Sequence, residues 1–390
     1  MMVINRRQFI TATLTSIGSL TLNHNALASP PGKLKNKHTA ALFLSAGDNA
    51  KGQHFIAAFA LDGQQQFLLN VPHRAHDSCC SPDKSSAVFF SRRPGTQLYI
   101  VDLNEGNLIQ TVNAKTGYHF YGHGVFSQDG RYLFTTENAY SFSDHNKSGI
   151  IGIYDTRNFQ RIGEYFSGGI GPHQLALLND ETTLTIANGG ILTHPDKQRE
   201  KLNLDSMQSS LTYLDSSNGK IIDQFLPSQQ HMSIRHLAVS NSDQVIVGVQ
   251  HQGTQYPKTR YQQGSDNTTP LVLSHSGESQ LQPMHADEDN WQALNQYIAS
   301  IAIDNSGKLA ISTSPRGNTV ALWDLSTLQC LGTMPVRDVA GACYISGQQQ
   351  FLISNGLGQV LMLPAQHDTL FATPAFSTRA IKWDNHLCLV

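Results

Sequence analysis

Four histidines of the chain recur at nearly the same distance ahead of an acidic turn. Each stands six or seven residues before an aspartate: His76 before Asp83, His123 before Asp129, His173 before Asp180 and His236 before Asp243. Neutral imidazole nitrogens are good ligands for Fe, Cu or Zn, and Glu137 would add a carboxylate. The pattern predicts a transition-metal site if the fold brings these side chains together. His386 lies near the end of its apolar segment and does not share the spacing.

Two other interpretations of the same region stay open. A histidine near the start of a strand also serves as a structural hydrogen-bonding group within its own sheet, so the spacing does not establish that the four converge. A different ligand, a carboxylate or phosphate, would suit the guanidinium groups of Arg92, Arg93, Arg235 and Arg316, which present a fork of donors.

The elements that must position these residues are repeats of short strands. A unit recurs six times between about residues 73 and 375, and it consists of an apolar strand, a polar turn, a second strand, a loop and a third strand, often followed by a fourth. Its first turns include 81-SPDKS-85, 127-SQDGR-131 and 304-DNSGK-308. Repeats of about 40–60 residues with four short strands are typical of a β-propeller.

A seventh unit can be assembled from the two ends of the repeat region. Residues 39–48, 54–63 and 65–71 provide three strands, and 379-RAIKWDNHLCLV-390 provides the leading one. Joining the ends in one sheet closes the ring and removes exposed edges. We therefore predict an all-β fold, a seven-bladed propeller of four-stranded blades spanning residues 39–390, with a short helical turn in 286–296.

The propeller topology predicts which polar residues share one mouth of the central channel. The start of each innermost strand and the end of the strand after it lie on the same face. The histidines occupy the first place in four successive blades, and Ser300 and Ala342 take it in the next two. Further residues predicted to line this mouth as a ligand pocket are Arg92, Arg93, Asn188, His194, Arg199, Arg235, Gln250, Arg316 and Asn355.

Composition excludes several classes of protein. The net charge of −2 and pI near 6.8 give no electrostatic case for binding nucleic acid. No segment has the 18 apolar residues in a row that a membrane span needs. The five cysteines form no CxxC motif, and no GxSxG or P-loop motif is present.

The N-terminus has the anatomy of a bacterial export signal. Paired Arg6 and Arg7 precede a mildly apolar stretch, and 26-ALA-28 resembles a cleavage site. The twin arginines followed by Phe9 favour a twin-arginine (Tat) signal over a Sec signal. We expect residues 1–28 to be the signal peptide, residues 29–38 a linker, and the mature protein to be periplasmic.

Several strings resemble a bacterial family known as domain of unknown function 1513, within the WD-like and YVTN-like propellers. They are 122-GHGVFS-127, 149-GIIGIYD-155, 170-IGPHQLALLND-180, 234-IRHLAV-239 and above all 185-TIANGGILTHPDKQREKLNLDSMQSSLTYLD-215. The resemblance covers nearly the whole mature chain. It implies a periplasmic seven-bladed propeller encoded beside imelysin-like and dihaem-peroxidase-like proteins, and so suggests partners in iron or redox-metal handling.

The family provides no established catalytic residues to carry over. Residues here that match its strings include His123, His173, Asn188, His194, Arg199 and His236. We expect residues 191–207 to form a flap over the mouth. His194, Asp196 and Arg199 would be available to a ligand, and Leu202, Leu204 and Met207 would pack the flap down.

Three functions follow, in order of preference. The first is a binding or accessory protein that holds a metal ion or metal complex on His76, His123, His173 and His236 with Glu137. The second is an enzyme at the same mouth, either a lactonase-like hydrolase or an oxidoreductase. A histidine-rich mouth with one clear carboxylate counts against the lactonase-like form. The third is a pure protein-interaction scaffold, and the sequence favours a non-enzyme overall.

Overall fold

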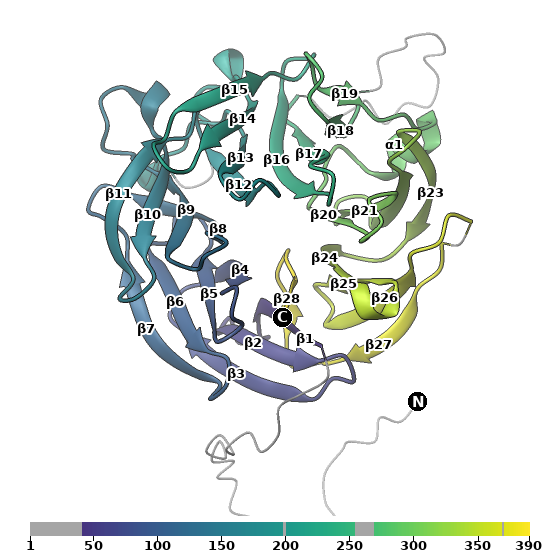
Figure 1. Cartoon of the computed structure of the whole chain (residues 1–390). Helices are drawn as coiled ribbons and strands as arrows, with labels where there is room; N and C mark the ends of the chain where they lie inside the picture. The colour runs from purple at the N-terminus through teal and green to yellow at the C-terminus, as the bar shows by residue number, and fades with distance from the viewer. Residues whose placement is uncertain (1–40, 198–199, 254–268, 369) are drawn as a thin grey trace, which may run out of the picture. The chain divides into compact units, whose positions relative to one another are not determined.

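The structure is a computed structural model that describes residues 41–197, 200–253, 269–368 and 370–390. The predicted export signal, the linker and Arg199 lie outside these residues. The described chain forms seven sheets arranged around a central channel (Figure 1), so the predicted all-β seven-bladed propeller is confirmed. None of the helices in the described ranges is both long and apolar enough to cross a membrane.

Six blades are each built from four consecutive strands, with the first strand innermost at the channel and the fourth outermost. The strands are β4 (Ala75–Cys80), β5 (Ser86–Ser91), β6 (Gln97–Asp102), β7 (Asn107–Asn113), β8 (His119–Phe126), β9 (Tyr132–Asn138), β10 (Gly149–Asp155), β11 (Gln160–Phe166), β12 (Pro172–Leu177), β13 (Thr183–Asn188), β14 (Ser210–Asp215), β15 (Ile221–Phe225), β16 (Met232–Val239), β17 (Val245–His251), β18 (Val272–His275), β19 (Gln282–Pro283), β20 (Ser300–Ile303), β21 (Leu309–Ser314), β22 (Thr319–Asp324), β23 (Gln329–Pro335), β24 (Val339–Ile345), β25 (Gln350–Asn355), β26 (Gln359–Pro364) and β27 (Thr373–Ser377).

The remaining blade joins both ends of the propeller, as predicted. Its strands are β1 (Leu42–Asp48), β2 (His54–Ala60), β3 (Gln65–Val71), β28 (Lys382–Trp383) and β29 (Cys388–Leu389). β28 pairs antiparallel with β1 through Gly47 and Trp383, and β29 pairs with β1 through Phe43 and Leu389. Figure 1 shows the C-terminal segment beside β1 at the channel.

Turn chemistry fixes where each innermost strand ends. After β8, the Asp129 carboxylate accepts hydrogen bonds from the Ser127 hydroxyl (2.6 Å) and the Arg131 amide (3.0 Å). Gly130 follows with φ of 71°, a left-handed conformation that costs glycine little. These turns place the aspartates of the sequence pattern at the end of the blade away from the histidines.

The core lies between blades. Strands β5, β13 and β21 are almost entirely buried, whereas the outer strands β7 and β15 are mostly exposed. The predicted helical turn is α1 (Glu288–Ala293), which begins where the Asp287 carboxylate accepts from the Asn290 amide. Short 3-10 turns occur at His145–Lys147, Pro195–Lys197, Leu204–Ser206 and Ser346–Gln348.

Candidate metal centre

Five histidines meet in the central channel. Neighbouring ring centroids are separated by 5.0 Å (His76 and His123), 4.9 Å (His123 and His173), 4.6 Å (His173 and His236), 4.9 Å (His236 and His386) and 4.7 Å (His386 and His76). The five side chains therefore form a closed circle, which we call the histidine cluster. The four predicted histidines converge, and His386, which the spacing argument set aside, is the fifth member.

β-bulges aim the first three of these side chains inward. The pairing register of β4 shifts at His76, and that of β12 shifts at His173. In β8 the irregularity is longer and spans residues 121–123, where Gly122 has φ of 107° and a Cβ atom would lie 2.8 Å from the His76 ring. A bulge leaves one residue outside the ladder and turns its side chain, which strands often use beside functional sites.

Acceptors behind three of the imidazoles fix their tautomers. The Nδ1 atoms of His76 and His123 lie 2.9 Å and 2.8 Å from carboxylate oxygens of Asp384 and Asp77. Nδ1 of His236 lies 3.3 Å from the Gln174 side-chain oxygen, which also accepts from the Leu237 amide. With hydrogen on Nδ1, each Nε2 keeps its lone pair. Carboxylate or amide support of this kind orients histidine ligands and raises their basicity.

The cluster contains buried nitrogens without partners. Among the described residues, Nε2 of His123, His236 and His386 and Nδ1 of His173 make no hydrogen bond. Such groups are uncommon in folded proteins, because an unsatisfied buried polar atom costs about 1–3 kcal/mol. Each therefore calls for an explanation, and a bound ion is one that matches their chemistry.

The ligand atoms are close enough to share an ion. They form two groups, His76 with His123 and His386, and His123 with His173 and His236, and within each the nitrogens lie within 4.8 Å of one another. In a tetrahedral zinc site with bonds of about 2.0–2.1 Å, ligand nitrogens lie about 3.4 Å apart. Movements of at most about 1.4 Å would bring three of these nitrogens to that spacing.

Burial keeps His76, His173, His236 and His386 neutral near pH 7. Burial lowers the pKa of His76 to about 4, although the hydrogen bond and charge of Asp384 offset part of this effect. Burial, together with the neighbouring imidazoles, holds the pKa of His173, His236 and His386 well below the usual value. Since only a neutral imidazole can bind a metal, the folded protein presents these side chains in the ligand form.

Glu137 does not join the histidines. Its side chain is fully buried, and its Oε1 accepts from the hydroxyls of Thr135 (2.8 Å) and Tyr154 (2.9 Å). Its Oε2 lies 3.0 Å from the Arg161 guanidinium. Glu137 belongs to neither group of candidate ligands. Its predicted place at the mouth followed from its position near the end of β9, but its side chain turns into its own blade, where it pairs with Arg161.

Two predicted pocket residues also work inside their blades. Asn188 is fully buried and bonds to Ser167, Ser210 and Thr212. Asn355 closes the turn after β25, where its Oδ1 accepts from the Leu357 and Gln359 amides. Neither amide is available to a ligand.

The other predicted pocket residues lie around the mouth. Arg92 lies 3.5 Å from the Asp384 carboxylate behind His76. Gln250 pairs with Tyr297 through an isolated backbone β-bridge. His194 contacts the Tyr140 ring, with centroids 5.3 Å apart. In the flap, Asn203 bonds to Leu192 and Gly190, and Met207 is buried. The expectation that Leu202 packs the flap down is wrong, because that side chain is 43% exposed.

Positive charges gather beside the cluster. The charges of Arg93 and Arg316 act on Arg235, and all three act on Lys201. Arg235 occupies the bulge of β16, the place that His76 and His173 hold in their blades. Arg93, Lys201, Arg235 and Arg316 are called the cationic rim below.

Sequence reasoning missed His386 and the three acceptors Asp77, Asp384 and Gln174. The signals were present but weak: Asp77 directly follows His76, Gln174 directly follows His173, and Asp384 and His386 share the short string 382-KWDNH-386. Their roles depend on bulges and on the closure of the ring, neither of which has a residue spacing of its own.

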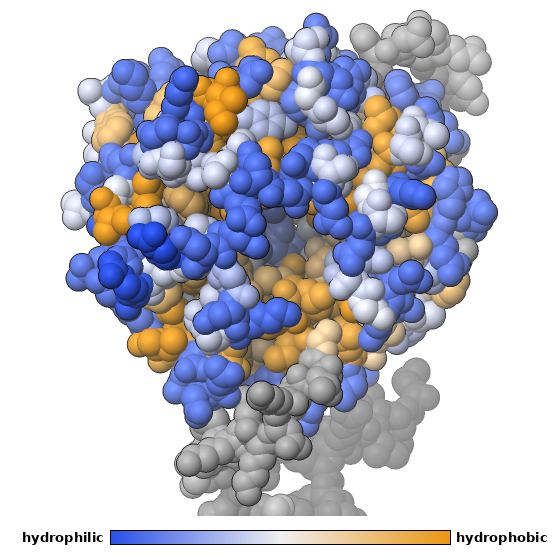
Figure 2. All heavy atoms as spheres, in the orientation of Figure 1, coloured by the Kyte–Doolittle hydropathy of each residue, from blue (hydrophilic) through white to orange (hydrophobic). Residues whose placement is uncertain are grey.

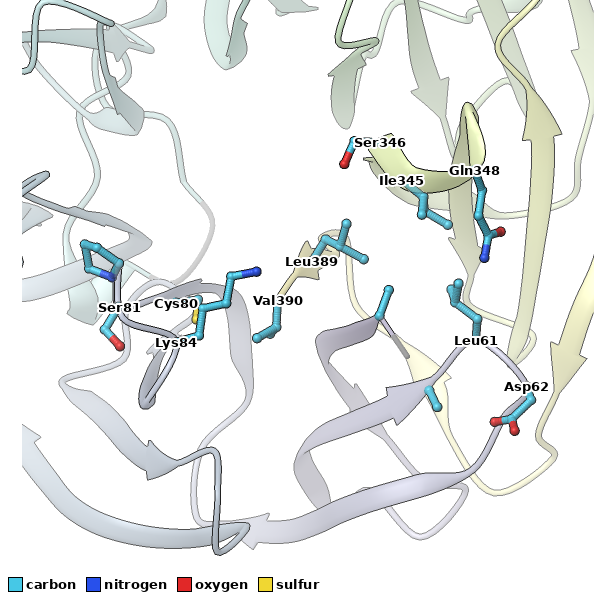
Figure 3. Close-up of a pocket in the computed structure, with 14 residues that line it drawn as sticks. Leu61, Asp62, Cys80, Ser81, Lys84, Ile345, Ser346, Gln348, Leu389 and Val390 are labelled. Atoms are coloured by element: carbon cyan, nitrogen blue, oxygen red, sulfur yellow. The ribbon is translucent and has the colours of Figure 1, made fainter. Parts of the chain in front are cut away.

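The opposite end of the channel is different. Strand β4 begins beside His76 and ends at Cys80, which lines a pocket of about 700 Å³ together with Leu61, Ile345, Leu389 and Val390 (Figure 3). Its walls are mainly apolar, and Lys84 and Asp62 stand at its margin. Figure 2 shows a face of the ring hollowed at its centre, with hydrophilic residues around much of the rim.

Fold and site together define a seven-bladed β-propeller with a histidine-lined channel. The chain belongs to the family described as protein of unknown function (DUF1513), which matches residues 69–390. A comparison with curated proteins finds no relative.

Solved structures share the fold at low sequence identity. Hydrazine synthase of Kuenenia stuttgartiensis matches with a TM-score of 0.57 and 13% identity, over 87% of this chain and 96% of that one. The WD40 repeats of RRP9 match with a TM-score of 0.56 and 13% identity, over 81% and 84%. U3-55K matches with a TM-score of 0.54 and 13% identity, over 78% and 83%. At this identity the similarity concerns the fold alone.

Proposed function

We propose that this protein is a metal-binding accessory protein whose channel holds a transition-metal ion on the histidine cluster. The observation that carries the proposal is the set of four buried, unpartnered imidazole nitrogens facing one another in the channel. Imidazole-only sites suit Fe, Cu or Zn, whereas Mg and Ca prefer oxygen ligands.

The supporting hydrogen bonds strengthen the case for binding. Asp77 and Asp384 stand behind His123 and His76 as outer carboxylates do in metalloproteins. Neither candidate ligand group contains a carboxylate, which gives no support to the lactonase-like alternative. All-imidazole sites also suit redox-active Cu or Fe, so an oxidoreductase would use the same ligands.

The cellular setting is part of the same proposal. The twin arginines and cleavage pattern support export to the periplasm, and the family resemblance supports work beside imelysin-like and dihaem-peroxidase-like proteins in iron or redox-metal handling. Replacing Arg6 and Arg7 together by lysine should retain the protein in the cytoplasm if the signal is of the Tat type. Unchanged export would contradict it.

Metal binding is tested by purifying the exported protein, measuring its metal content, and titrating metal-stripped protein with Fe(II), Cu(II) and Zn(II). We expect one of these ions to bind and to raise the midpoint of thermal unfolding, since an ion at 100 times its Kd adds about 2.7 kcal/mol of stability. A folded, metal-free protein that none of the three ions affects would overturn the proposal.

Matched variants separate the cluster from other buried histidines. His123→Ala should weaken binding by more than the roughly 10–100-fold that loss of an outer hydrogen-bond partner costs. The control is His275→Gln, because both nitrogens of His275 already have partners, the Tyr213 hydroxyl (2.7 Å) and the Glu278 carbonyl (2.9 Å). Circular dichroism and thermal unfolding establish that both variants fold, and equal metal affinities in the two would contradict the assignment.

A further inference from the structure

Three members of the cationic rim, Arg235, Arg316 and Lys201, carry charge that no ion pair among the described residues neutralises. The charges of Arg93 and Arg316 act on Arg235, and the same three guanidinium groups act on Lys201. Like charges gathered in one place repel one another, and an anion between them relieves the repulsion.

Arg235 connects the rim to the histidine cluster. It occupies the bulge of β16 directly before His236, and its Nε donates to the Ser233 hydroxyl at 3.3 Å. Its positive charge contributes to the low pKa of both His173 and His236. A ligand that contacts Arg235 would therefore lie beside the nitrogens available to a metal.

Buried hydroxyls near the rim lack partners. The Tyr121 hydroxyl and the Thr193 hydroxyl beside it are both buried, and neither makes a hydrogen bond of normal geometry among the described residues. The charges of Arg93 and Arg235 act on Tyr121, which comes from the bulge of β8 that also positions His123. A hydroxyl aimed among cations is a donor ready for an anion's oxygen.

Arg316 follows β21, in the blade next to the one that carries Arg235. Its guanidinium lies over the Tyr297 ring, 5.0 Å from the centroid, a cation–π contact that leaves its N–H groups free to point elsewhere. The Tyr297 hydroxyl accepts from the Asn385 amide at 3.3 Å, beside His386. The rim and the cluster thus share the segment 384–386.

We propose that the cationic rim binds a compact anion with at least two oxygens, a small carboxylate or an oxyanion, through Arg235, Arg316, Lys201 and the Tyr121 hydroxyl. Bound there, the anion places a free oxygen toward the histidine cluster, where it serves as a further ligand to the ion. This second part rests on the proposed metal-binding function, whereas the first does not.

Calorimetric titration with oxalate and with inorganic phosphate tests the rim in metal-stripped protein. We expect at least one of them to bind, more weakly as NaCl is raised, because salt screens exposed charge. A preference for oxalate identifies a carboxylate ligand, and a preference for phosphate identifies an oxyanion. Absence of binding by both, at low salt, overturns the proposal whatever the result with metal.

Variants assign the site. Arg235→Gln and the exposed Arg316→Gln should each weaken anion binding by about 10-fold or more, the loss expected for a hydrogen bond to a charged group. Arg131→Gln, at an exposed turn at the other end of its blade, is the matched control. Anion affinities in Arg235→Gln and Arg316→Gln equal to that of the control would overturn the assignment.

Repeating the titration on Zn-loaded protein tests the second part. Tighter anion binding in the loaded protein than in the stripped protein supports an anion that contacts the ion. Equal affinities overturn the shared ligation. If no ion binds at all, the proposed function fails while the metal-free titration still decides whether the rim binds anions.

Discussion

Glu137 and the histidine cluster are two sets of buried polar side chains that the sequence places together. They differ in whether their polar atoms have hydrogen-bond partners. Around Glu137, both carboxylate oxygens have donors, from Thr135, Tyr154 and Arg161. In the histidine cluster, Nδ1 of His123 and of His236 is held by an acceptor, and Nε2 of each is left without a partner among the described residues. In the first arrangement both oxygens have donors within the blade, whereas in the second some nitrogens have none among the described residues.

The same contrast separates His119 from the histidine cluster. His119 is 1% exposed, with Nδ1 on the Phe120 carbonyl (3.0 Å) and Nε2 beside the Asn138 amide (2.9 Å). It starts the innermost strand of its blade four residues before His123, and it fulfils the structural role that we considered for the whole set. Burial and residue type therefore do not identify a ligand histidine, but an unused lone pair does.

Lowering the pH should separate the two sets of side chains most strongly, because it should reduce the free energy of unfolding through histidines that are neutral in the folded protein. In metal-stripped protein, burial lowers the pKa of His76, His173, His236 and His386, so these side chains stay neutral below pH 6.5, whereas in the unfolded chain they take up protons there. The unfolded state then binds more protons, so stability falls with falling pH from about 6.5, by about 1.4 kcal/mol per pH unit for each histidine still neutral when folded. For His76 the loss continues until about pH 4, where it protonates in the folded state too.

Urea unfolding at pH 7.0, 6.0 and 5.0 measures this slope. The matched variant is His76→Gln, which has no proton to take up and should show a shallower loss. A wild-type stability that stays constant over this range would show that the histidines are not held neutral.

Glu137→Ala should give the largest effect of a single substitution on stability. Removing the carboxylate breaks the ion pair with the Arg161 guanidinium, whose side chain is 16% exposed, and leaves it Glu164 at 2.8 Å as its remaining carboxylate partner. Breaking a buried ion pair costs about 3–5 kcal/mol, and metal affinity should not change. Chemical denaturation and metal titration check both parts, with the exposed Glu105→Ala as control. Loss of metal binding in a folded Glu137→Ala protein would place Glu137 in the site after all.

Asp77→Asn should weaken metal binding by about 10–100-fold, because the neutral amide supports the His123 imidazole less well. Stability should change much less than in Glu137→Ala. The control is Asp324→Asn, since Asp324 also faces a histidine. That histidine, His367 at 3.2 Å, is exposed and lies outside the histidine cluster. An unchanged affinity in Asp77→Asn would mean that this carboxylate does not support a ligand.

Tyr154→Phe should have the smallest effect of the series. It removes the hydroxyl that donates to Glu137 Oε1 at 2.9 Å while Thr135 and Arg161 remain. Loss of a hydrogen bond to a charged group costs about 1.5–3 kcal/mol, and the remaining donors should keep the cost near the lower figure. Thermal and urea unfolding measure it, and an affinity for metal different from wild type would contradict the separation of the two polar groups.

The fold could be predicted because its signals are local and repeated. Aspartate and glycine at turns such as 127-SQDGR-131 mark each blade, and the leading strand at 379–390 identified the closing blade. The in-register histidines likewise followed from the position of each turn, since each stands six or seven residues before the turn aspartate.

The rest of the site depends on features without a local signal. The bulges at His76, His173 and Arg235 decide which side chains leave the ladder. Each bulge adds one residue to its strand, and the spacing of apolar and polar residues in the sequence does not reveal it. Glu137 was misplaced because alternation along β9 sends it toward Arg161, a residue two strands away. His386 was set aside because its place depends on pairing with β1 across more than 300 residues.

The closure of the ring gives the cluster a consequence for kinetics. The C-terminal segment pairs with β1 at four positions, Gly47 with Trp383, Asp48 with Lys382, Phe43 with Leu389 and Leu44 with Cys388. Opening at this joint would draw His386 away from His76. An ion bound to both would have to lose a ligand first. Metal should therefore lower the rate of unfolding. The lifetime of the closed ring would then measure how often the channel is occupied.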